Sequence, residues 1–317
     1  MPINIVAYCA GEIGIPPNVV RRIAAGAPKM YKRFPIKKRG GRGVRIVAQP
    51  AREVKVLQRA IVRFLSKTIA VHEAATAYVK GASVVRNASV HLCSNYILKM
   101  DFEEFFESIS MLDVQHFLRL SFGGGITDAE IELISRAVTW RNPVGLVSLC
   151  IGAPSSPFLS NAMMFIFDAR ISLYCKEHGV TYTRYSDDLT FGAESRELLV
   201  LTEGYVRKVV AELGVPQLRL NEKKRVLVGR ASARRITGTY LSTQGKLTVG
   251  RLRKRGIRAG VKKFLSGGLS EKATKKLKGE IAFACDVEED FPFLLRRWYG
   301  QDVAPLVPKR FSTGSDW

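Results

Sequence analysis

The sequence is short of acidic residues, and this shortage is its first informative feature. Its 317 residues include 50 Lys and Arg but only 28 Asp and Glu, which leaves a formal net charge of +22. A folded chain with this excess is suited to a polyanionic partner, so we expect nucleic acid. The sequence also lacks any apolar run near the length of about eighteen residues that a membrane span needs. Because Lys and Arg are not confined to one amphipathic segment, a membrane surface is only the competing hypothesis.

Patterned cysteines and internal repeats are also missing. The five cysteines are scattered and odd in number, so we expect neither a zinc site nor a disulfide framework, but small buried side chains in a reducing compartment. Residues 1–6 contain no basic residue and do not begin a long apolar stretch, so we expect no secretory signal and a cytoplasmic protein. Without a repeat period a solenoid is excluded, and 46% hydrophobic content predicts two or three packed lobes.

Local patterns predict three elements in the first third of the chain. Apolar residues from Val54 to Leu65 recur at helical spacing, which predicts a helix with one buried side. Residues 37–47 read as two short strands around a glycine-rich turn that carries several cations. Residues 96–101 form a β-prone run that ends at Asp101, where we expect the strand to give way to a helical turn.

Three later segments show equally clear patterns. Residues 152–157, Gly-Ala-Pro-Ser-Ser-Pro, predict a turn that leads into one helix, whose apolar face comprises Leu159, Met163, Ile166, Phe167, Ile171 and Tyr174. Residues 180–185 and 189–191 are β-prone and predict a hairpin around Ser-Asp-Asp. Between positions 246 and 278 twelve Lys and Arg accompany a single acid, which predicts a basic helical lobe with one apolar face formed by Ile257, Val261, Phe264 and Leu265.

Three carboxylates stand at the ends of these β-prone runs. Asp187 and Asp188 would repel each other at a hairpin tip, so a cation between them is expected. With Asp101 they could form a hard-oxygen site for two Mg²⁺ ions that activate a hydroxyl and stabilise leaving pyrophosphate. The simpler alternatives are a solvated turn for the pair and a helix N-cap before Glu104 for Asp101.

Several motifs in register resemble those of bacterial reverse transcriptases. They are Tyr-Ser-Asp-Asp at 185–188, Asp-Phe-Glu-Glu-Phe-Phe-Glu-Ser-Ile at 101–109 and the 152–157 turn, and their order and spacing also match. More narrowly, Asn87, Ala88 and His91 resemble the Asn-Ala-x-x-His signature of retron reverse transcriptases, and Ile236, Thr237 and Gly238 resemble their Val-Thr-Gly signature. The resemblance runs from about residue 37 to residue 299.

This resemblance implies an α+β right-hand polymerase fold with fingers, palm and thumb. Residues 1–95 would form an N-terminal segment and fingers. Residues 96–245 would form the palm, with an antiparallel sheet, the catalytic hairpin and a fingers insertion at about 119–150. Residues 246–317 would form a basic helical thumb that follows an RNA–DNA hybrid or grips folded RNA.

The resemblance also implies roles for single residues. Asp101, Asp187 and Asp188 would be the catalytic, metal-binding carboxylates for two Mg²⁺ ions, with Mn²⁺ as a substitute. Phe106 would lie under the sugar of the incoming dNTP, although a core phenylalanine is the plainer interpretation. The remaining positions expected at the dNTP are Lys38 and Arg45, which otherwise belong to a solvated basic loop, and Lys224, Ile151 and Gly152.

Three departures from the family pattern bear on these roles. Ile151 stands where many relatives have glutamine, so it can pack but cannot hydrogen-bond to the nucleotide. Arg225 replaces the usual threonine after Lys224, and Ser186 replaces the commoner alanine.

His91 alone would be an interior histidine; within its signature it is expected to shape the RNA or the fold, without a proton-transfer role.

The favoured hypothesis is a retron reverse transcriptase. Such an enzyme copies part of its cognate noncoding RNA into a small single-stranded DNA, primed from a 2′-hydroxyl of that RNA, and acts in anti-phage defence. The expected partners are this RNA, its DNA product, dNTPs and an effector such as an ATPase with an HNH nuclease. A membrane is not among them. The alternatives are a scaffold that holds an RNA–DNA hybrid to restrain an effector, and a group II intron-like or other defence-associated reverse transcriptase.

Overall fold

The computed structural model describes residues 4–37 and 43–311. The chain forms two compact units. The first comprises Met1–Lys80, Leu98–Phe191 and Glu197–Val226, and the second comprises Gly81–Ile97, Gly192–Arg196 and Leu227–Trp317. Within the described ranges, no helix has both the length and the apolar character that a membrane span requires.

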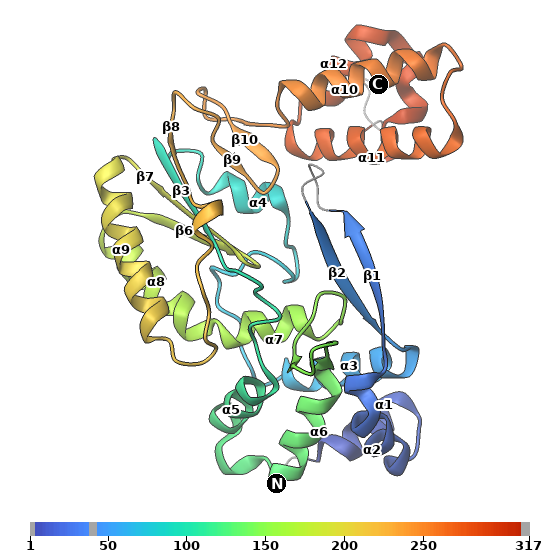
Figure 1. Cartoon of the computed structure of the whole chain (residues 1–317). Coiled ribbons are helices and arrows are strands. Elements are labelled where there is room, and N and C mark those ends of the chain that lie inside the picture. Colours follow the sequence, from blue (N-terminus) through green and yellow to red (C-terminus); the bar gives the residue numbers. More distant parts are fainter. Residues whose placement is uncertain (1–3, 38–42, 312–317) are drawn as a thin grey trace. The chain divides into compact units, whose positions relative to one another are not determined.

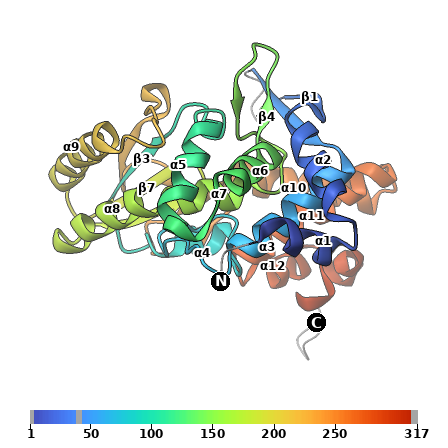
Figure 2. The same ribbon diagram turned by 90° about the horizontal axis from the view of Figure 1, so that it is seen from below.

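A layer of helices forms the main core of the first unit (Figure 2). It contains α1 (Ile5–Ile13), α2 (Pro17–Gly26), α3 (Arg52–Leu65), α5 (Met111–Phe122) and α6 (Asp128–Val138), with the short 3₁₀ turns η1 (Ala27–Lys29) and η2 (Gly123–Gly125). The helix expected from Val54 to Leu65 is confirmed as α3, and its apolar side is buried against α1, α2 and α6. Ser110 and Thr127 begin α5 and α6 with capping boxes, which satisfy backbone N–H groups at both helix starts.

A two-stranded hairpin follows η1. Strand β1 (Tyr31–Lys37) pairs antiparallel with β2 (Val44–Pro50), with Tyr31 opposite Pro50 and Lys37 opposite Val44. The two strands expected on either side of the glycine-rich turn are therefore present. The turn itself, with Lys38, lies outside the described residues. A shorter hairpin, β4 (Trp140–Arg141) with β5 (Val147–Ser148), lies in the same unit.

The central sheet has four strands in the order β6-β7-β3-β8 (Figure 1). They are β3 (Tyr96–Asp101), β6 (Thr181–Tyr185), β7 (Asp188–Ala193) and β8 (Val226–Gly229). The expected strand at 96–101 and the expected hairpin at 180–191 are both confirmed. Helices α8 (Phe165–Glu177) and α9 (Arg196–Glu212) lie side by side on one side of this sheet, joined by stacked rings of Tyr174 and Tyr205 with centroids 4.1 Å apart.

One expectation about the helices is wrong. A single helix was expected after the 152–157 turn, but the chain forms α7 (Ser156–Met163) and then α8, with a break at Met164. Met164 has φ −82° and ψ 2°, which interrupts the helical path. Apolar residues continue on both sides of the break, so hydrophobic spacing alone does not reveal it.

The second unit combines a short helix, a small sheet and a helical lobe. Helix α4 (Val84–Ser89) accompanies a three-stranded sheet in the order β11-β10-β9, formed by β9 (Arg235–Ile236), β10 (Thr239–Leu241) and β11 (Leu247–Thr248). The lobe contains α10 (Arg251–Leu265), α11 (Glu271–Val287), α12 (Phe291–Tyr299) and the 3₁₀ turns η4 (Gly300–Leu306) and η5 (Lys309–Phe311). A second core lies among these helices.

The expected apolar face of the basic lobe is mostly confirmed. Ile257 and Val261 are buried in the core between α10 and α11, and Phe264 packs against that core. Leu265 is instead 42% exposed at the last residue of α10, so its inclusion in the buried face was wrong. The final turn of a helix has no following turn to cover its outer side, which explains the exposure of Leu265.

Candidate active site

The structure brings the three aspartates onto neighbouring strands. Asp101 is the last residue of β3, and Asp188 is the first residue of β7, which lies beside β3 in the sheet. Asp187 lies in the two-residue turn between β6 and β7. The backbone N–H of Phe102 donates to the carbonyl of Asp187 over 3.2 Å, which ties this turn to the end of β3. Since no helix begins at Asp101, the N-cap alternative does not apply.

Burial and like charge disturb the ionisation of these carboxyl groups. The Asp101 side chain is 3% exposed, and its pKa is raised to about 7, chiefly by this burial. The negative charges of Asp187 and Asp188 contribute to the rise, because a second negative charge disfavours ionisation, whereas Lys224 opposes it. The pKa of Asp187 is likewise raised, by burial first and then by Asp188. A positive charge placed among these groups would therefore be strongly favoured.

Lys224 supplies such a charge to Asp101. Its Nζ lies 2.7 Å from Oδ1 and 2.8 Å from Oδ2 of Asp101. Lys224 stands on the 3₁₀ turn η3 (Glu222–Lys224), and Asn221 just before it donates its backbone N–H to the Asp101 carbonyl over 2.7 Å. The sequence analysis placed Lys224 near the dNTP, and the structure shows its contact with Asp101.

An ion-pair network on the outer side fixes the same turn. Arg225 donates to both Glu203 oxygens of α9, the closest approach being 2.6 Å. Arg207, also on α9, donates to Glu203 and to Glu222. The arginine that replaces the usual threonine therefore anchors η3 to α9.

The three aspartates offer carboxylate oxygens, which are the kind of ligand that a divalent ion binds. In this structure, however, the carboxylates are not arranged around a common ion position. In the part of the chain that the structure describes, no three His, Cys, Asp or Glu side chains are grouped closely enough to hold a metal ion. The Asp101 oxygens instead face the ammonium of Lys224. Hard carboxylate oxygens are the ligands that Mg²⁺ or Mn²⁺ prefers, and such an ion would supply positive charge beside Asp101.

Two more charged residues lie close to these aspartates. Arg45 of β2 lowers the pKa values of Asp187 and Glu107, which places its guanidinium within electrostatic reach of both. Glu107 is a fourth acidic group near the site, and burial raises its pKa. Sequence reasoning pointed to Arg45 but did not single out Glu107, because Glu107 lies in an acidic stretch where each residue has the same charge.

The segment before α7 packs against β2. Ile151 accepts a hydrogen bond from the backbone N–H of Ala48 over 2.8 Å through its carbonyl. Gly152 has φ +117°, and a Cβ there would lie 2.6 Å from the Ala48 carbonyl oxygen. Only glycine fits this close approach. Phe106 is half-buried and packs against the helical core of the first unit, with its ring centroid 5.5 Å from that of Phe105.

Comparison with known proteins identifies the family. The model of the reverse transcriptase (RNA-dependent DNA polymerase) family matches residues 36–241. Retron Ec83 reverse transcriptase of Escherichia coli is 38% identical over 288 residues, which cover 90% of this chain and 91% of that protein. Retron Ec86 reverse transcriptase of E. coli is 30% identical, over 86% of this chain and 81% of that protein.

The chain belongs to the retron reverse transcriptases. It is an RNA-directed DNA polymerase, and RNA is its template partner. The solved telomerase of Candida albicans, in complex with a TWJ fragment of telomeric RNA, has a TM-score of 0.51 and 14% identity over 90% of this chain. That likeness shows a shared fold, so the predicted right-hand polymerase fold is confirmed. The chain spans 57% of the length of that telomerase.

The two retron signatures contact each other within the second unit. Asn87 of α4 is buried, and its Nδ2 donates to Thr237 Oγ1 over 3.4 Å. Thr237 in turn donates to the carbonyl of Val84 over 3.3 Å. Ala88 and Ile236 are both buried in one small core, while Gly238 takes φ +92° in the turn between β9 and β10. These residues hold α4 to the small sheet.

His91, the last residue of the first signature, lies against strand β7. It is fully buried, and burial lowers its pKa to about 4, so the ring is neutral at physiological pH. Gly192 of β7 leaves the space for it: a Cβ at that position would lie 2.9 Å from His91 Nδ1 and 2.2 Å from Ser94 Oγ. The need for glycine at 192 was not predicted, because nothing in a β-prone run shows which neighbour approaches it.

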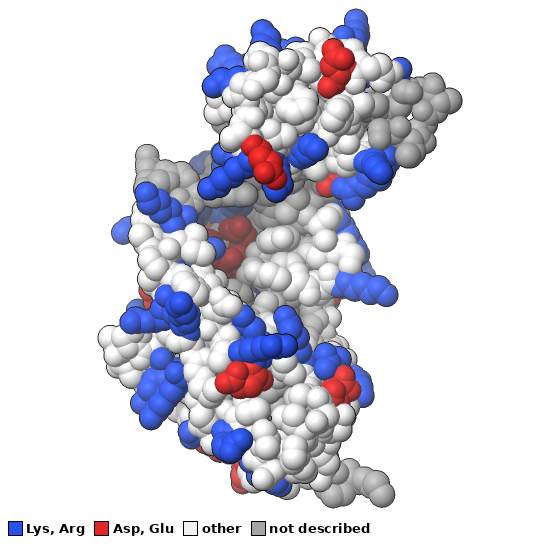
Figure 3. Space-filling model, turned by 90° about the vertical axis from the view of Figure 1, so that its right-hand side faces the viewer, with Lys and Arg blue, Asp and Glu red and all other residues white. Residues whose placement is uncertain are grey.

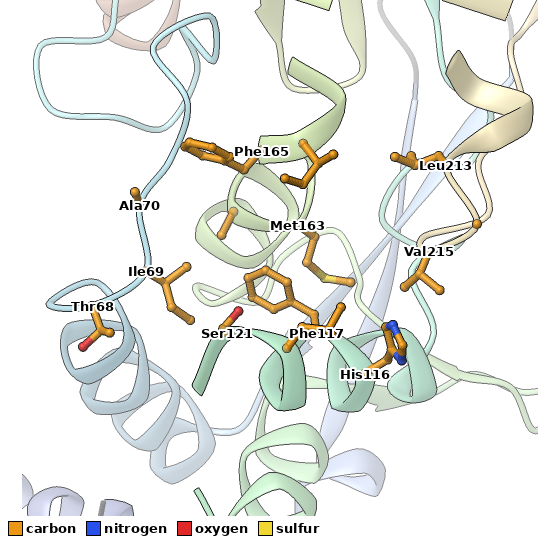
Figure 4. Close-up of a pocket in the computed structure, with 14 residues that line it drawn as sticks. Thr68, Ile69, Ala70, His116, Phe117, Ser121, Met163, Phe165, Leu213 and Val215 are labelled. Atoms are coloured by element: carbon orange, nitrogen blue, oxygen red, sulfur yellow. The ribbon is translucent and has the colours of Figure 1, made fainter. Parts of the chain in front are cut away.

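A separate apolar pocket of about 660 Å³ lies in the first unit. Phe117 of α5 and Met163 of α7 point into it, and His116 lies at its edge (Figure 4). None of the three aspartates lines it. It is therefore distinct from the candidate active site.

Proposed function

We propose that this retron reverse transcriptase copies part of a structured noncoding RNA into single-stranded DNA, starting from a 2′-hydroxyl of that RNA. The observation that carries the proposal is the placement of Asp101, Asp187 and Asp188 at adjoining strand ends, where Asp187 and Asp188 raise the pKa of Asp101 and Asp188 raises that of Asp187. Nucleotidyl transfer rests on positioning and charge neutralisation, and such a carboxylate cluster can hold the divalent ions that supply both. The resemblance to retron enzymes over most of the chain supports the RNA-linked start.

The three aspartates would hold two divalent ions, Mg²⁺ in the first instance. When bound, these ions would activate the attacking hydroxyl and neutralise charge on the leaving pyrophosphate. The chain itself supplies the remaining charges. Lys224 favours the ionised form of Asp101 by opposing the rise of its pKa, and Arg45 places a guanidinium near Asp187 that is suited to triphosphate oxygens. Ile151 and Phe106 would border the nucleotide by packing alone.

The proposed subdomains of the chain are those of the polymerase fold. We propose fingers within residues 1–95, a palm at 96–245 with a fingers insertion at about 119–150, and a thumb at 246–317. Exposed cations of α10 and α11 would follow the phosphates of an RNA–DNA hybrid. In Figure 3, blue Lys and Arg side chains are spread over the visible face while red acidic side chains are sparse, which is consistent with a polyanionic partner.

A defence role and an effector partner belong to the same proposal. The resemblance of the 151–157 stretch to one retron branch suggests an effector composed of an ATPase and an HNH nuclease. The RNA–DNA product would remain with the enzyme and restrain that effector. Phage challenge of cells that carry the complete locus would test this role against a locus in which only the polymerase site is altered.

The product itself gives the sharpest test of the proposed function. The enzyme is purified together with the RNA encoded beside its gene, and the associated nucleic acid is treated with RNase, DNase and a debranching enzyme. We expect a short DNA joined to RNA by a 2′,5′ linkage, which the debranching enzyme releases. A DNA with a free 5′ end would contradict 2′-hydroxyl priming and favour an intron-like enzyme.

The scaffold alternative is tested by the same preparation. With Asp187→Asn and Asp188→Asn in one chain, the proposed function predicts that RNA still co-purifies but DNA is missing. If the doubly altered chain retained both assembly and defence, synthesis would be dispensable and a pure scaffold would be the better account.

A further inference from the structure

A buried ion pair lies beneath the turn that carries Asp187. Arg184 of β6 and Asp168 of α8 have fully buried side chains. Arg184 Nε donates to both carboxylate oxygens of Asp168, at 2.9 and 3.1 Å, and a terminal nitrogen donates to Oδ2 at 2.6 Å. The pair is therefore a two-pronged contact with little freedom to rotate.

The other terminal nitrogen of Arg184 reaches the turn itself. It donates to the backbone carbonyl of Ser186 over 3.1 Å and to Asn161 Oδ1 over 2.9 Å. Asn161 is held by its own donation to the Ala77 carbonyl over 2.8 Å, and Tyr182 donates to Asp168 Oδ1 over 2.7 Å. The guanidinium is thus fixed from three sides, by α7, by α8 and by its own strand.

Ser186 is a residue whose backbone needs such support. Its φ is +62°, the left-handed region, which a residue with a Cβ adopts at a cost. The carbonyl that Arg184 binds belongs to the peptide unit joining Ser186 to Asp187. The next peptide unit is held from the opposite side, because the Asp187 carbonyl accepts from Phe102 N–H, directly after Asp101.

Stability alone gives a weak reason for this arrangement. Removing two charges from water is costly, and well-packed apolar side chains of similar volume can replace a buried ion pair without loss of stability. Apolar side chains, however, cannot donate a hydrogen bond to the Ser186 carbonyl. The strained turn is therefore the feature that needs a charged and rigid guanidinium at this place.

We propose that Arg184 is a positioning residue for the polymerase site. Held by Asp168 and Asn161, it fixes the peptide unit between Ser186 and Asp187, and so sets where the carboxylates of Asp187 and Asp188 stand relative to Asp101. This inference rests on the proposed function, because it assigns a support to the same carboxylates.

The test compares two arginine–carboxylate pairs in which one partner lies on α8. Arg184→Lys keeps a positive charge but loses the fork that reaches Asp168 and Ser186 at once. Arg170→Lys is the matched control, because Arg170 lies on α8 and pairs with Glu212 over 2.5 Å at the surface. Each variant is measured for Mn²⁺ binding by electron paramagnetic resonance, for kcat and KM on an RNA template with a DNA primer, and for thermal unfolding without metal.

We expect Arg184→Lys to weaken Mn²⁺ binding and to lower kcat, each by about tenfold or more, with little change in KM for the primer–template. Arg170→Lys should leave all three unchanged. Adding Ser186→Gly to Arg184→Lys should restore part of the Mn²⁺ affinity, because glycine takes a positive φ without strain. A merely structural role would lower the unfolding temperature without moving the Mn²⁺ affinity.

The outcomes separate this inference from the proposed function. Unchanged Mn²⁺ affinity and kcat in a folded Arg184→Lys chain would overturn the positioning role. If that variant does not fold, Asp168→Asn serves in its place, since its amide oxygen still accepts from Arg184; a smaller loss of Mn²⁺ affinity supports the role, and no loss overturns it. Failure of the unaltered chain to copy RNA would instead refute the proposed function.

Discussion

At the scale of single residues, the pKa of Asp101 is set by burial and by its charged neighbours. It is raised to about 7, chiefly by burial, and Lys224 is the group that opposes this shift. Removing the ammonium should therefore raise the pKa further and leave more of the carboxyl protonated at neutral pH. A protonated carboxyl is a poor ligand for Mg²⁺.

We therefore predict that Lys224→Met loses activity at pH 7 and regains part of it at higher pH. If the pKa of Asp101 rises by about one unit, RNA-templated activity at pH 7 should fall about fivefold, with a smaller deficit at pH 8.5. The measurement is the pH profile of dNTP incorporation at fixed Mg²⁺. Lys223→Met, an exposed neighbour on the same turn, is the control. A parallel loss at every pH would contradict this explanation.

Some residues of the candidate site could be predicted from the sequence, and others could not. Asp101, Asp187 and Asp188 could be singled out because each stands next to a β-prone run, where a charged carboxylate is uncommon. Arg184 and Asp168 remained hidden, because an arginine within a strand and an aspartate within a helix are ordinary surface residues by pattern. Only the fold shows that both are fully buried and face each other.

At the scale of elements, Gly152 joins the α7 lead to strand β2. We predict that Gly152→Ala lowers the free energy of unfolding by about 2 kcal/mol or more, because the new Cβ meets the Ala48 carbonyl and the positive φ is strained. Urea unfolding would measure this loss. Gly145→Ala is the control, since Gly145 has φ +89° but no atom within 4 Å of the added Cβ. Equal losses in the two variants would mean that the contact with β2 contributes nothing.

His91 makes the stability of the folded chain depend on pH. Its pKa is lowered to about 4 in the folded chain, against about 6.5 when unfolded, so the unfolded state binds more protons between these values. The stability that it contributes is therefore complete above pH 6.5 and is lost as the pH falls toward 4.

We predict that the free energy of unfolding falls by about 2 kcal/mol more in the unaltered chain than in His91→Gln between pH 7.5 and pH 5. Comparing the two chains removes the contribution of carboxyl groups such as Asp101, whose raised pKa acts in the opposite sense. The same pH dependence in both chains would show that the ring of His91 is not held neutral by the fold.

Elements were predicted from sequence more completely than the junctions between them. The helix α3, the strand β3 and the β6–β7 hairpin follow from spacing and residue type. The break at Met164 does not, because apolar residues continue on both sides of it, and the approach of Gly192 to His91 does not, because it depends on a segment distant in sequence. The same limit applied to the two retron signatures, whose mutual contact only the fold reveals.

At the scale of the whole molecule, the net charge of +22 predicts binding that weakens steeply with salt. Arg255, Lys262 and Lys263 lie exposed on α10. Replacing all three by Gln should reduce the slope of log affinity against log salt by about two for an RNA–DNA hybrid. Replacing the exposed Arg21, Arg22 and Arg59 by Gln removes the same charge from α2 and α3 and serves as the control. Equal slope changes would mean that α10 is not a preferred contact.

The central claim, that Asp101, Asp187 and Asp188 form the polymerase site, is tested most directly by single Asp→Asn variants assayed for RNA-templated dNTP incorporation. The control is Asp128→Asn, an 85% exposed aspartate at the start of α6. We predict that each of the three site variants loses at least about 10²-fold in kcat while folding normally, and that the control keeps full activity. Incorporation at the unaltered rate by any one of the three would contradict the account.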